Sequence, residues 1–184
     1  AGIIEGFNNI FLSYKLKSIN RTFTETFFDL TFPFNIEVNH LLFEMKSYPG
    51  LIRLLEHKNV DIANDTIISI YNILLSGSDS TTKARHPHFD AIQECGGVQK
   101  IYQLYFKNKG KFSRDRAALC IAVLFRAREI ADAQMRHDII SHLKALTTDP
   151  DLWTKTEAKL GLKELISNTV NKGEIESGGF TIPD

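Results

Sequence analysis

The sequence predicts an all-α chain assembled from a repeated pair of helices. Three observations lead to this prediction. Apolar residues recur at spacings of three and four along most of the 184 residues, which is the period of an amphipathic helix. The same paired pattern returns at nearly constant offsets. Hydrophobic residues make up 43% of the chain, enough for a sizeable core, and 22 basic residues balance 22 acidic ones.

The N-terminal 47 residues predict three helices, over 3–16, 22–32 and 36–45. The second ends at Pro33, because proline cannot continue a helix. Its Thr and Phe content would also fit a strand, but every neighbouring segment is helical. Eight of the 13 phenylalanines lie in this part, at positions 7, 11, 23, 27, 28, 32, 34 and 43. We expect them to cap the end of the core, and the alternative is an exposed apolar patch for a partner.

The remainder of the chain predicts seven further helices, at 48–57, 61–76, 88–95, 97–107, 113–128, 132–147 and 155–169. Residues 76–87 consist of turn formers and predict a loop. Residues 170–184 lack periodicity and predict a flexible tail. The predicted organisation is therefore a helical cap or degenerate repeat over 1–47, repeats over 48–169, and a C-terminal tail over 170–184.

An internal repeat supports this division. Two apolar triads on consecutive helices, centred on Leu54 and Ile70, return around Leu104 and Ile121 at offsets of 50 and 51 residues. A third copy follows 42 and 41 residues later, at Leu146 and Leu162. The first period is longer by about nine residues, which the loop at 76–87 accommodates. Such units bury their apolar faces against each other, so none is expected to be stable alone.

Two segments resemble parts of an armadillo repeat. In residues 89–106 a short helix ends at Gly96-Gly97 and a second helix follows with apolar residues three apart, as in the first two helices of that family. Residues 64–74 resemble the third helix, including an asparagine, Asn72, before an Ile-Leu pair. The resemblance covers 48–169 and implies a right-handed α-α superhelix of about three repeats, whose third helices line a groove. The related two-helix HEAT repeat is the alternative.

The resemblance also implies a set of groove residues. In armadillo proteins the asparagine that matches Asn72 often hydrogen-bonds the backbone of an extended peptide; alternatively, Asn72 tethers a local backbone group or faces water. The same alignment adds further partner-binding candidates: Asp65, Ser69, Arg116, Cys120, Glu157 and Glu164. Their mixed charges favour a mixed-charge peptide or helix over a polyanion. Importin-α-like binding of basic peptides is disfavoured, because the tryptophan expected four residues before Asn72 is Ile68, while the sole tryptophan, Trp153, lies at a helix entrance.

Several classes of function lack support in the sequence. Charge neutrality disfavours nucleic-acid binding, and no apolar run is long enough for a membrane span. No phosphate loop or hydrolase motif occurs, so we expect neither catalysis nor a cofactor. His86 and His88 lack the further ligands of a metal site. Cys95 and Cys120 lie in apolar helical segments, which indicates reduced thiols and a cytoplasmic or nuclear setting.

We therefore expect a non-enzymatic protein-interaction scaffold that binds a peptide or helix of a partner protein in its groove. The alternative is a dimerisation or assembly module of a larger protein that uses the Phe-rich N-terminal end, which makes a homodimer possible. A helical enzyme or metal-dependent hydrolase remains a third class. The chain opens with Ala1 rather than Met, which is consistent with an excised or processed piece of a longer protein.

Overall fold

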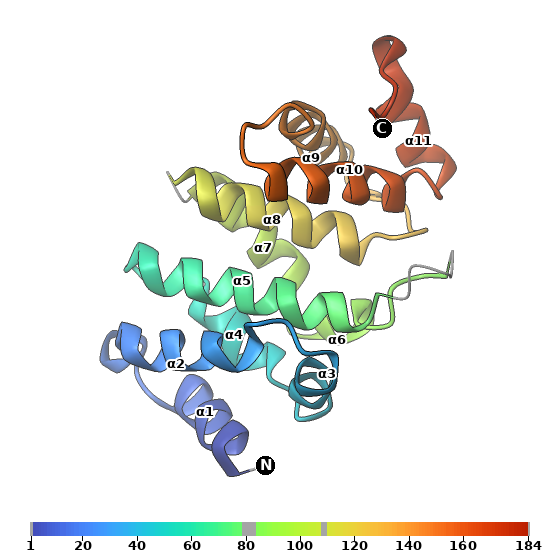
Figure 1. Cartoon of the computed structure of the whole chain (residues 1–184). Helices are drawn as coiled ribbons and strands as arrows, with labels where there is room; N and C mark the ends of the chain where they lie inside the picture. The colour runs from blue at the N-terminus through green and yellow to red at the C-terminus, as the bar shows by residue number, and fades with distance from the viewer. Residues whose placement is uncertain (1, 79–83, 108–109, 184) are drawn as a thin grey trace.

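The computed structural model describes residues 2–78, 84–107 and 110–183. The regular structure in these ranges consists of helices alone, as the sequence predicts (Figure 1). Residues 79–83 of the predicted loop lie outside the described residues. None of the described helices combines the length and the apolar character needed to cross a bilayer.

The helices follow the predicted order with ends that differ by a few residues. In the first half they are α1 (Gly2–Ser13), α2 (Arg21–Thr31), α3 (Ile36–Glu44), α4 (Tyr48–Leu54), α5 (Val60–Ser76) and α6 (Phe89–Glu94). In the second half they are α7 (Gly97–Lys107), α8 (Lys111–Leu124), α9 (Ala133–Leu146), α10 (Leu152–Leu165) and α11 (Thr169–Glu176). Two short 3-10 turns, η1 (Leu16–Ser18) and η2 (Ser177–Gly179), complete the list. The segment compatible with either helix or strand is helical, as α2.

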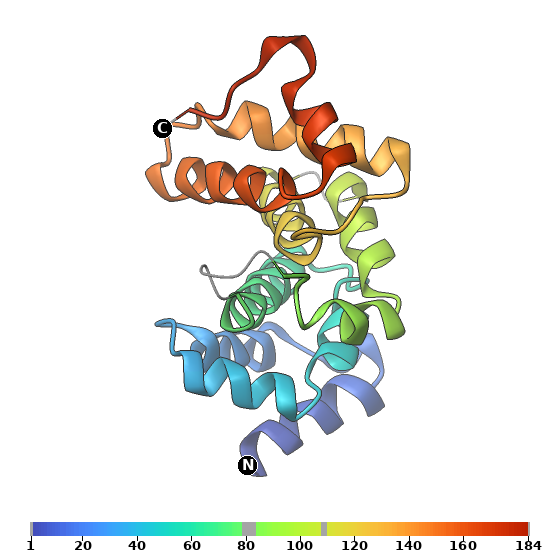
Figure 2. The same cartoon turned by 90° about the vertical axis from the view of Figure 1, so that its right-hand side faces the viewer.

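Four helices form the front of the molecule. In Figure 1, α2, α5, α8 and α10 run across the view as successive layers, and each contacts the next. Helices α4 and α7 lie behind α5 and α8 and contact them. The two termini lie at opposite ends of the stack, which Figure 2 shows from the side. The chain is therefore a solenoid in which each layer packs mainly on its neighbours.

Helix α8 is the most enclosed element. Its eight consecutive residues Ala117–Leu124 are all buried. The helix has α5 on one side and α10 on the other, and it also contacts α7 and α9, so no face of this stretch is left for solvent, whereas Lys111, Phe112 and Arg114 before it are exposed. The approach of α10 is close enough that a Cβ atom on Gly161 would lie 2.9 Å from Cβ of Ala122. Glycine at that position therefore permits the helices to pack this tightly.

A left-handed residue recurs between paired helices. Gly96, between α6 and α7, has a φ of 68°, and Lys46, 50 residues earlier between α3 and α4, has a φ of 56°. Lysine adopts this conformation at a cost that glycine avoids. Helix α3 therefore precedes α4 as α6 precedes α7; the sequence places α3 in the segment 1–47, a helical cap or a degenerate repeat. The lysine conceals this correspondence, because only the second junction has the glycine signature.

The N-terminal phenylalanines divide between core and surface. Phe11 and Phe27 are buried and meet edge to face with ring centroids 5.4 Å apart, and Phe7 packs on both. Phe32 and Phe34, at the end of α2, are exposed. The phenylalanines therefore contribute in part to the core at this end of the chain and in part to its exposed apolar surface.

Residues 170–184 differ from the predicted flexible tail, because most of helix α11 lies there. Ile175 is buried, and the buried Asn171 amide accepts a hydrogen bond from Ile130 N (3.1 Å) and donates one to Arg128 O (2.8 Å). Further along, Lys144 lies over the Phe180 ring. His137 and Lys144 of α9 also contact Glu174, and Phe180 and Ile182 pack against the core. The segment is therefore anchored by scattered polar and apolar contacts rather than by an apolar stripe, so helical periodicity does not reveal it.

Candidate functional site

A groove of about 480 Å³ lies where α2, α5, α8 and α10 meet. Its lining residues come from these four helices and from Phe32, which directly follows α2. They are Arg21, Phe28, Phe32, Asp61, Asn64, Asp65, Ile68, Asn72, Phe112, Arg116 and Trp153. Three of the seven predicted partner-binding residues, Asp65, Asn72 and Arg116, lie in this groove. The groove is therefore the candidate site.

Asn72 uses one side of its amide within the protein. Its Nδ2 donates to Thr31 Oγ1 (3.1 Å) and, more weakly, to Thr31 O (3.5 Å), which ties α5 to the end of α2. This is the local tether that the sequence analysis left open. Oδ1 of Asn72 accepts no hydrogen bond from the described residues, so it is the side of the amide left for a ligand.

Asp65 is neutralised by its neighbours. Thr24 Oγ1 donates to its carboxylate (3.0 Å), and Arg21 Nε lies 3.5 Å away. Burial raises the pKa of the Asp65 carboxyl, while the contacts with Thr24 and Arg21 oppose that rise. Asp65 therefore shares the positive charge of Arg21 with Asp61 and Glu25.

Arg116 is held by aromatic rings instead of by carboxylates. Its guanidinium carbon lies 3.8 Å from the centre of the Trp153 ring and 4.7 Å from that of Phe112. No ion pair or hydrogen bond joins its guanidinium to another described residue, and its buried Nε has no acceptor. Oδ1 of Asn64, also on the groove, is buried without a donor. Both atoms are enclosed by the fold, so it is the rest of the half-buried Arg116 guanidinium that is left to meet a ligand in the groove.

Two predicted residues lie in the packed interior, which corrects the expectation that they line the groove. Ser69 is buried and donates to Asp65 O in its own helix (2.7 Å). Cys120 is fully buried with Sγ 3.9 Å from Ile67 O, and burial raises the pKa of its thiol. Cys120 lies at the contact between α5 and α8, whereas Ser69 shares a helix face with Asp65 and Asn72, whose side chains bond to α2.

The two predicted glutamates on α10 have intramolecular partners and lie outside the lining of the groove. Glu157 accepts a hydrogen bond from Tyr71 Oη, which connects α10 with α5 past the intervening α8. Glu164 lies 3.5 Å from Arg126 Nε, and burial raises the pKa of its carboxyl against the opposing charge of Arg126. Neither side chain is directed to a ligand in this arrangement.

The aromatic character of the groove is not predicted by the sequence pattern. Phe28 and Phe32 come from the N-terminal Phe-rich segment, Phe112 from the first turn of α8, and Trp153 from the start of α10. One local signal was available, because Phe112 and Arg116 are four residues apart and therefore share a helix face. The approach of Trp153 depends on the packing of α10 on α8, which no local pattern indicates.

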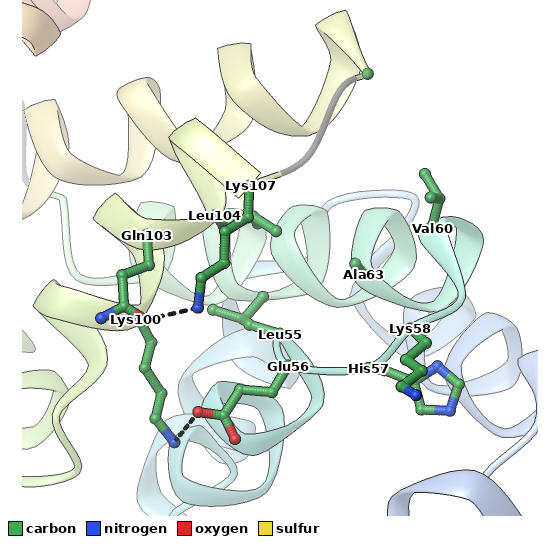
Figure 3. Close-up of a pocket in the computed structure, with 11 residues that line it drawn as sticks. Leu55, Glu56, His57, Lys58, Val60, Ala63, Lys100, Gln103, Leu104 and Lys107 are labelled. Atoms are coloured by element: carbon green, nitrogen blue, oxygen red, sulfur yellow. Dashed lines mark hydrogen bonds and ion pairs between the residues drawn. The ribbon is translucent and has the colours of Figure 1, made fainter.

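A second hollow, of about 500 Å³, lies where the end of α4 and the start of α5 face α7 (Figure 3). Four of its polar groups pair with each other: Lys100 lies 3.3 Å from Glu56, and Lys107 donates to Gln103 (3.2 Å). It contains none of the predicted partner-binding residues. It therefore offers a weaker candidate site than the groove.

The histidines are engaged inside the protein. His86 Nε2 lies 3.0 Å from Leu74 O, and His88 Nδ1 lies 2.9 Å from Tyr48 Oη. His137 and His142, five residues apart on α9, meet different helices, as their spacing predicts. Across the described residues, no group of three or more His, Cys, Asp or Glu side chains has an arrangement that could hold a metal ion.

No protein-family model matches the sequence, and no curated protein sequence is similar to it. Two solved structures are similar in fold. A designed armadillo repeat protein in complex with the peptide (KR)4 has a TM-score of 0.66 at 15% identity, over 97% of this chain and 71% of that one. The crystal structure of an engineered protein has a TM-score of 0.65 at 15% identity, over 96% and 68%. These similarities confirm the predicted architecture: the chain has an all-helical, armadillo-like repeat fold.

Proposed function

We propose that this chain is a protein-interaction scaffold that binds a peptide or helix of a partner protein in the groove of α2, α5, α8 and α10. The main support is the composition of the groove. Aromatic side chains from three helices surround polar atoms of Asn64 and Arg116 that lack partners among the described residues. Preformed apolar clefts with a few convergent polar groups are typical of binding sites. The designed armadillo neighbour, solved with a peptide, supports the same proposal.

Binding would use the physical properties of the groove without chemical catalysis or a cofactor. The aromatic faces of Phe28, Phe112 and Trp153 would cover apolar side chains of the partner. Asn72 Oδ1 would accept from a peptide N–H, and Arg116 would donate to an oxygen. Both cysteines are free thiols, which supports our proposal of a reducing compartment, the cytoplasm or the nucleus.

A display experiment tests this proposal. Peptides selected from a random library on the immobilised chain are measured again on the double variant Phe112→Ala/Trp153→Ala. Both side chains are partly exposed, so their removal should leave the circular dichroism spectrum unchanged. We expect affinity to fall by about tenfold or more, because buried aromatic anchors usually dominate such interfaces. The matched control is Phe106→Ala, an exposed aromatic of α7 outside the groove. Selected peptides that bind the double variant as tightly as the parent would refute the groove as the site.

A second candidate function is assembly through the N-terminal end. An apolar hollow lies between α1 and α2, lined by Gly2, Ile3, Gly6, Phe7, Ile10, Thr22, Phe23 and Thr26, and Ile3 is 69% exposed. Terminal repeats need cover, so this face would suit a second copy or a neighbouring segment of a longer chain. Sedimentation of the chain should then show a dimer that Ile3→Glu disrupts. A strict monomer at high concentration would exclude self-association.

A further inference from the structure

The charges of the groove indicate the chemistry of its ligand. We infer that the preferred partner segment presents a carboxylate side chain next to a bulky apolar one, with the carboxylate on Arg116. This inference rests on the proposed function, because it specifies what the same groove binds. It also separates this chain from its designed neighbour, which was solved with the basic peptide (KR)4.

The acidic side of the groove is already occupied. Arg21 lies 3.5 Å from Asp65 and 4.0 Å from Asp61, and Thr24 donates to Asp65 as well. Arg21 also lies 3.8 Å from Glu25, so one arginine is shared by three carboxylates. A lysine or arginine from a partner would gain little there, because Asp61 and Glu25 are exposed, where ion pairs are weak, and the more enclosed Asp65 already has Arg21 and Thr24 as partners.

The basic side of the groove is open. The carboxylates that influence Arg116 through space are engaged elsewhere: Asp115 with Lys111 (2.7 Å) and His142 (2.8 Å), and Asp151 with the Thr154 amide (2.8 Å). Burial lowers the pKa of Arg116, but a guanidinium remains charged at neutral pH. The cation is therefore partly desolvated and lacks an ion pair among the described residues, which strengthens its attraction for an added carboxylate.

The surroundings of Arg116 also favour this geometry. The rings of Trp153 and Phe112 contact the guanidinium face, which orients its plane and leaves its N–H edge for a planar carboxylate. Across the groove, Phe28 and Phe32 stack at 5.7 Å with an angle of 9° between the rings. Ile68 adds to this wall. An apolar side chain beside the carboxylate would cover this aromatic surface.

The groove contains its own reporter, because Trp153 is the single tryptophan of the chain and is 39% exposed. Its emission is followed during titration with three alternating peptides that lack aromatic residues: (Glu-Leu)4, (Gln-Leu)4 and (Lys-Leu)4. We expect the glutamate peptide to bind about tenfold more tightly than the glutamine peptide, and the lysine peptide to bind most weakly. The advantage of glutamate should shrink as salt is added.

Variants then assign the preference to one residue, with affinities measured by calorimetry because Arg116 itself affects Trp153. Arg116→Gln should remove the preference for glutamate, and Arg116→Lys should restore part of it. The matched control is Arg114→Gln, which removes the same charge from the same helix at an exposed position outside the groove. It should leave the preference unchanged. Circular dichroism establishes that each variant is folded.

Two failures are distinguishable. If the lysine peptide binds as tightly as the glutamate peptide, or if Arg116→Gln keeps the preference, the carboxylate inference is wrong and the groove remains a binding site. If none of the three peptides produces a signal by fluorescence or calorimetry at about 1 mM, the weak end of useful affinities, both the inference and the proposed function are overturned.

Discussion

Acid should unfold this protein through two histidines that the fold keeps neutral. His86 and His88 are 3% and 1% exposed, and His88 stacks on Phe43 at 3.7 Å. Burial lowers the pKa of His86 to about 4, with a further contribution from the positive charge of Arg126. Burial likewise lowers the pKa of His88 to about 3. The folded chain therefore resists protonation at pH values where an unfolded histidine is charged.

The sign and size of the effect follow from linkage. An unfolded histidine has a pKa of about 6.5, so below that pH the unfolded state binds more protons than the folded state and stability falls. The loss continues until the pH approaches the folded values, near 4 for His86 and 3 for His88. At about pH 5 each histidine should cost about 2 kcal/mol, since 1 pKa unit corresponds to about 1.4 kcal/mol.

Urea unfolding followed by Trp153 emission at about pH 7.5 and about pH 5 measures this loss. His86→Gln should reduce the difference in unfolding free energy between the two pH values by about 2 kcal/mol, whatever it does to the stability at the higher pH. The reasoning is refuted if His86→Gln and the parent lose the same stability between the two pH values.

Three further substitutions probe the packing. Gly161→Ala should destabilise the chain by about 1–3 kcal/mol, because the new methyl would lie 2.9 Å from a side chain of α8. Gly173→Ala should instead stabilise it by about 0.5–1 kcal/mol, because the new methyl meets no atom within 4 Å. Equal urea midpoints for the two variants would contradict this pair of predictions. Asn72→Ala should cost about 1 kcal/mol by removing the hydrogen bond to Thr31, and an unchanged midpoint would exclude the tether. Asn171→Ala should cost about 2–4 kcal/mol and accelerate amide exchange in α11, and parental exchange rates there would show that the helix is anchored otherwise.

The sequence predicts the fold well because the signals are local. The stripe with Ile67, Ile70 and Leu74 specifies α5, and the returning offsets specify the stack, since each layer must bury the next. Helix α11 escapes this reasoning, because Asn171 holds it through backbone groups of residues about 40 positions earlier. A polar contact of that range leaves no periodic trace in the sequence.

The candidate site is less predictable than the fold. Alignment with a repeat assigns a helix face, and that is sufficient to place Asp65, Asn72 and Arg116 on the groove. The alignment does not tell which positions on that face a neighbouring helix covers. Ser69 and Cys120 are therefore aligned with groove positions although both are buried. The alignment also does not identify the side chains that other helices of the stack contribute to the groove. The aromatic lining arises from the assembled stack and is visible only in three dimensions.

The hydrogen bond from Tyr71 to Glu157 joins α5 to α10, two helices with α8 between them. In a stack held only by contacts between adjacent layers, the curvature is the sum of independent small angles. A side-chain hydrogen bond that skips one layer makes the angle between α5 and α8 depend on the angle between α8 and α10. A change in the angle between α5 and α10 would strain this hydrogen bond. Because Tyr71 also packs on Trp153 of the groove, the geometry of the groove depends on one tyrosine and one glutamate as well as on helix packing.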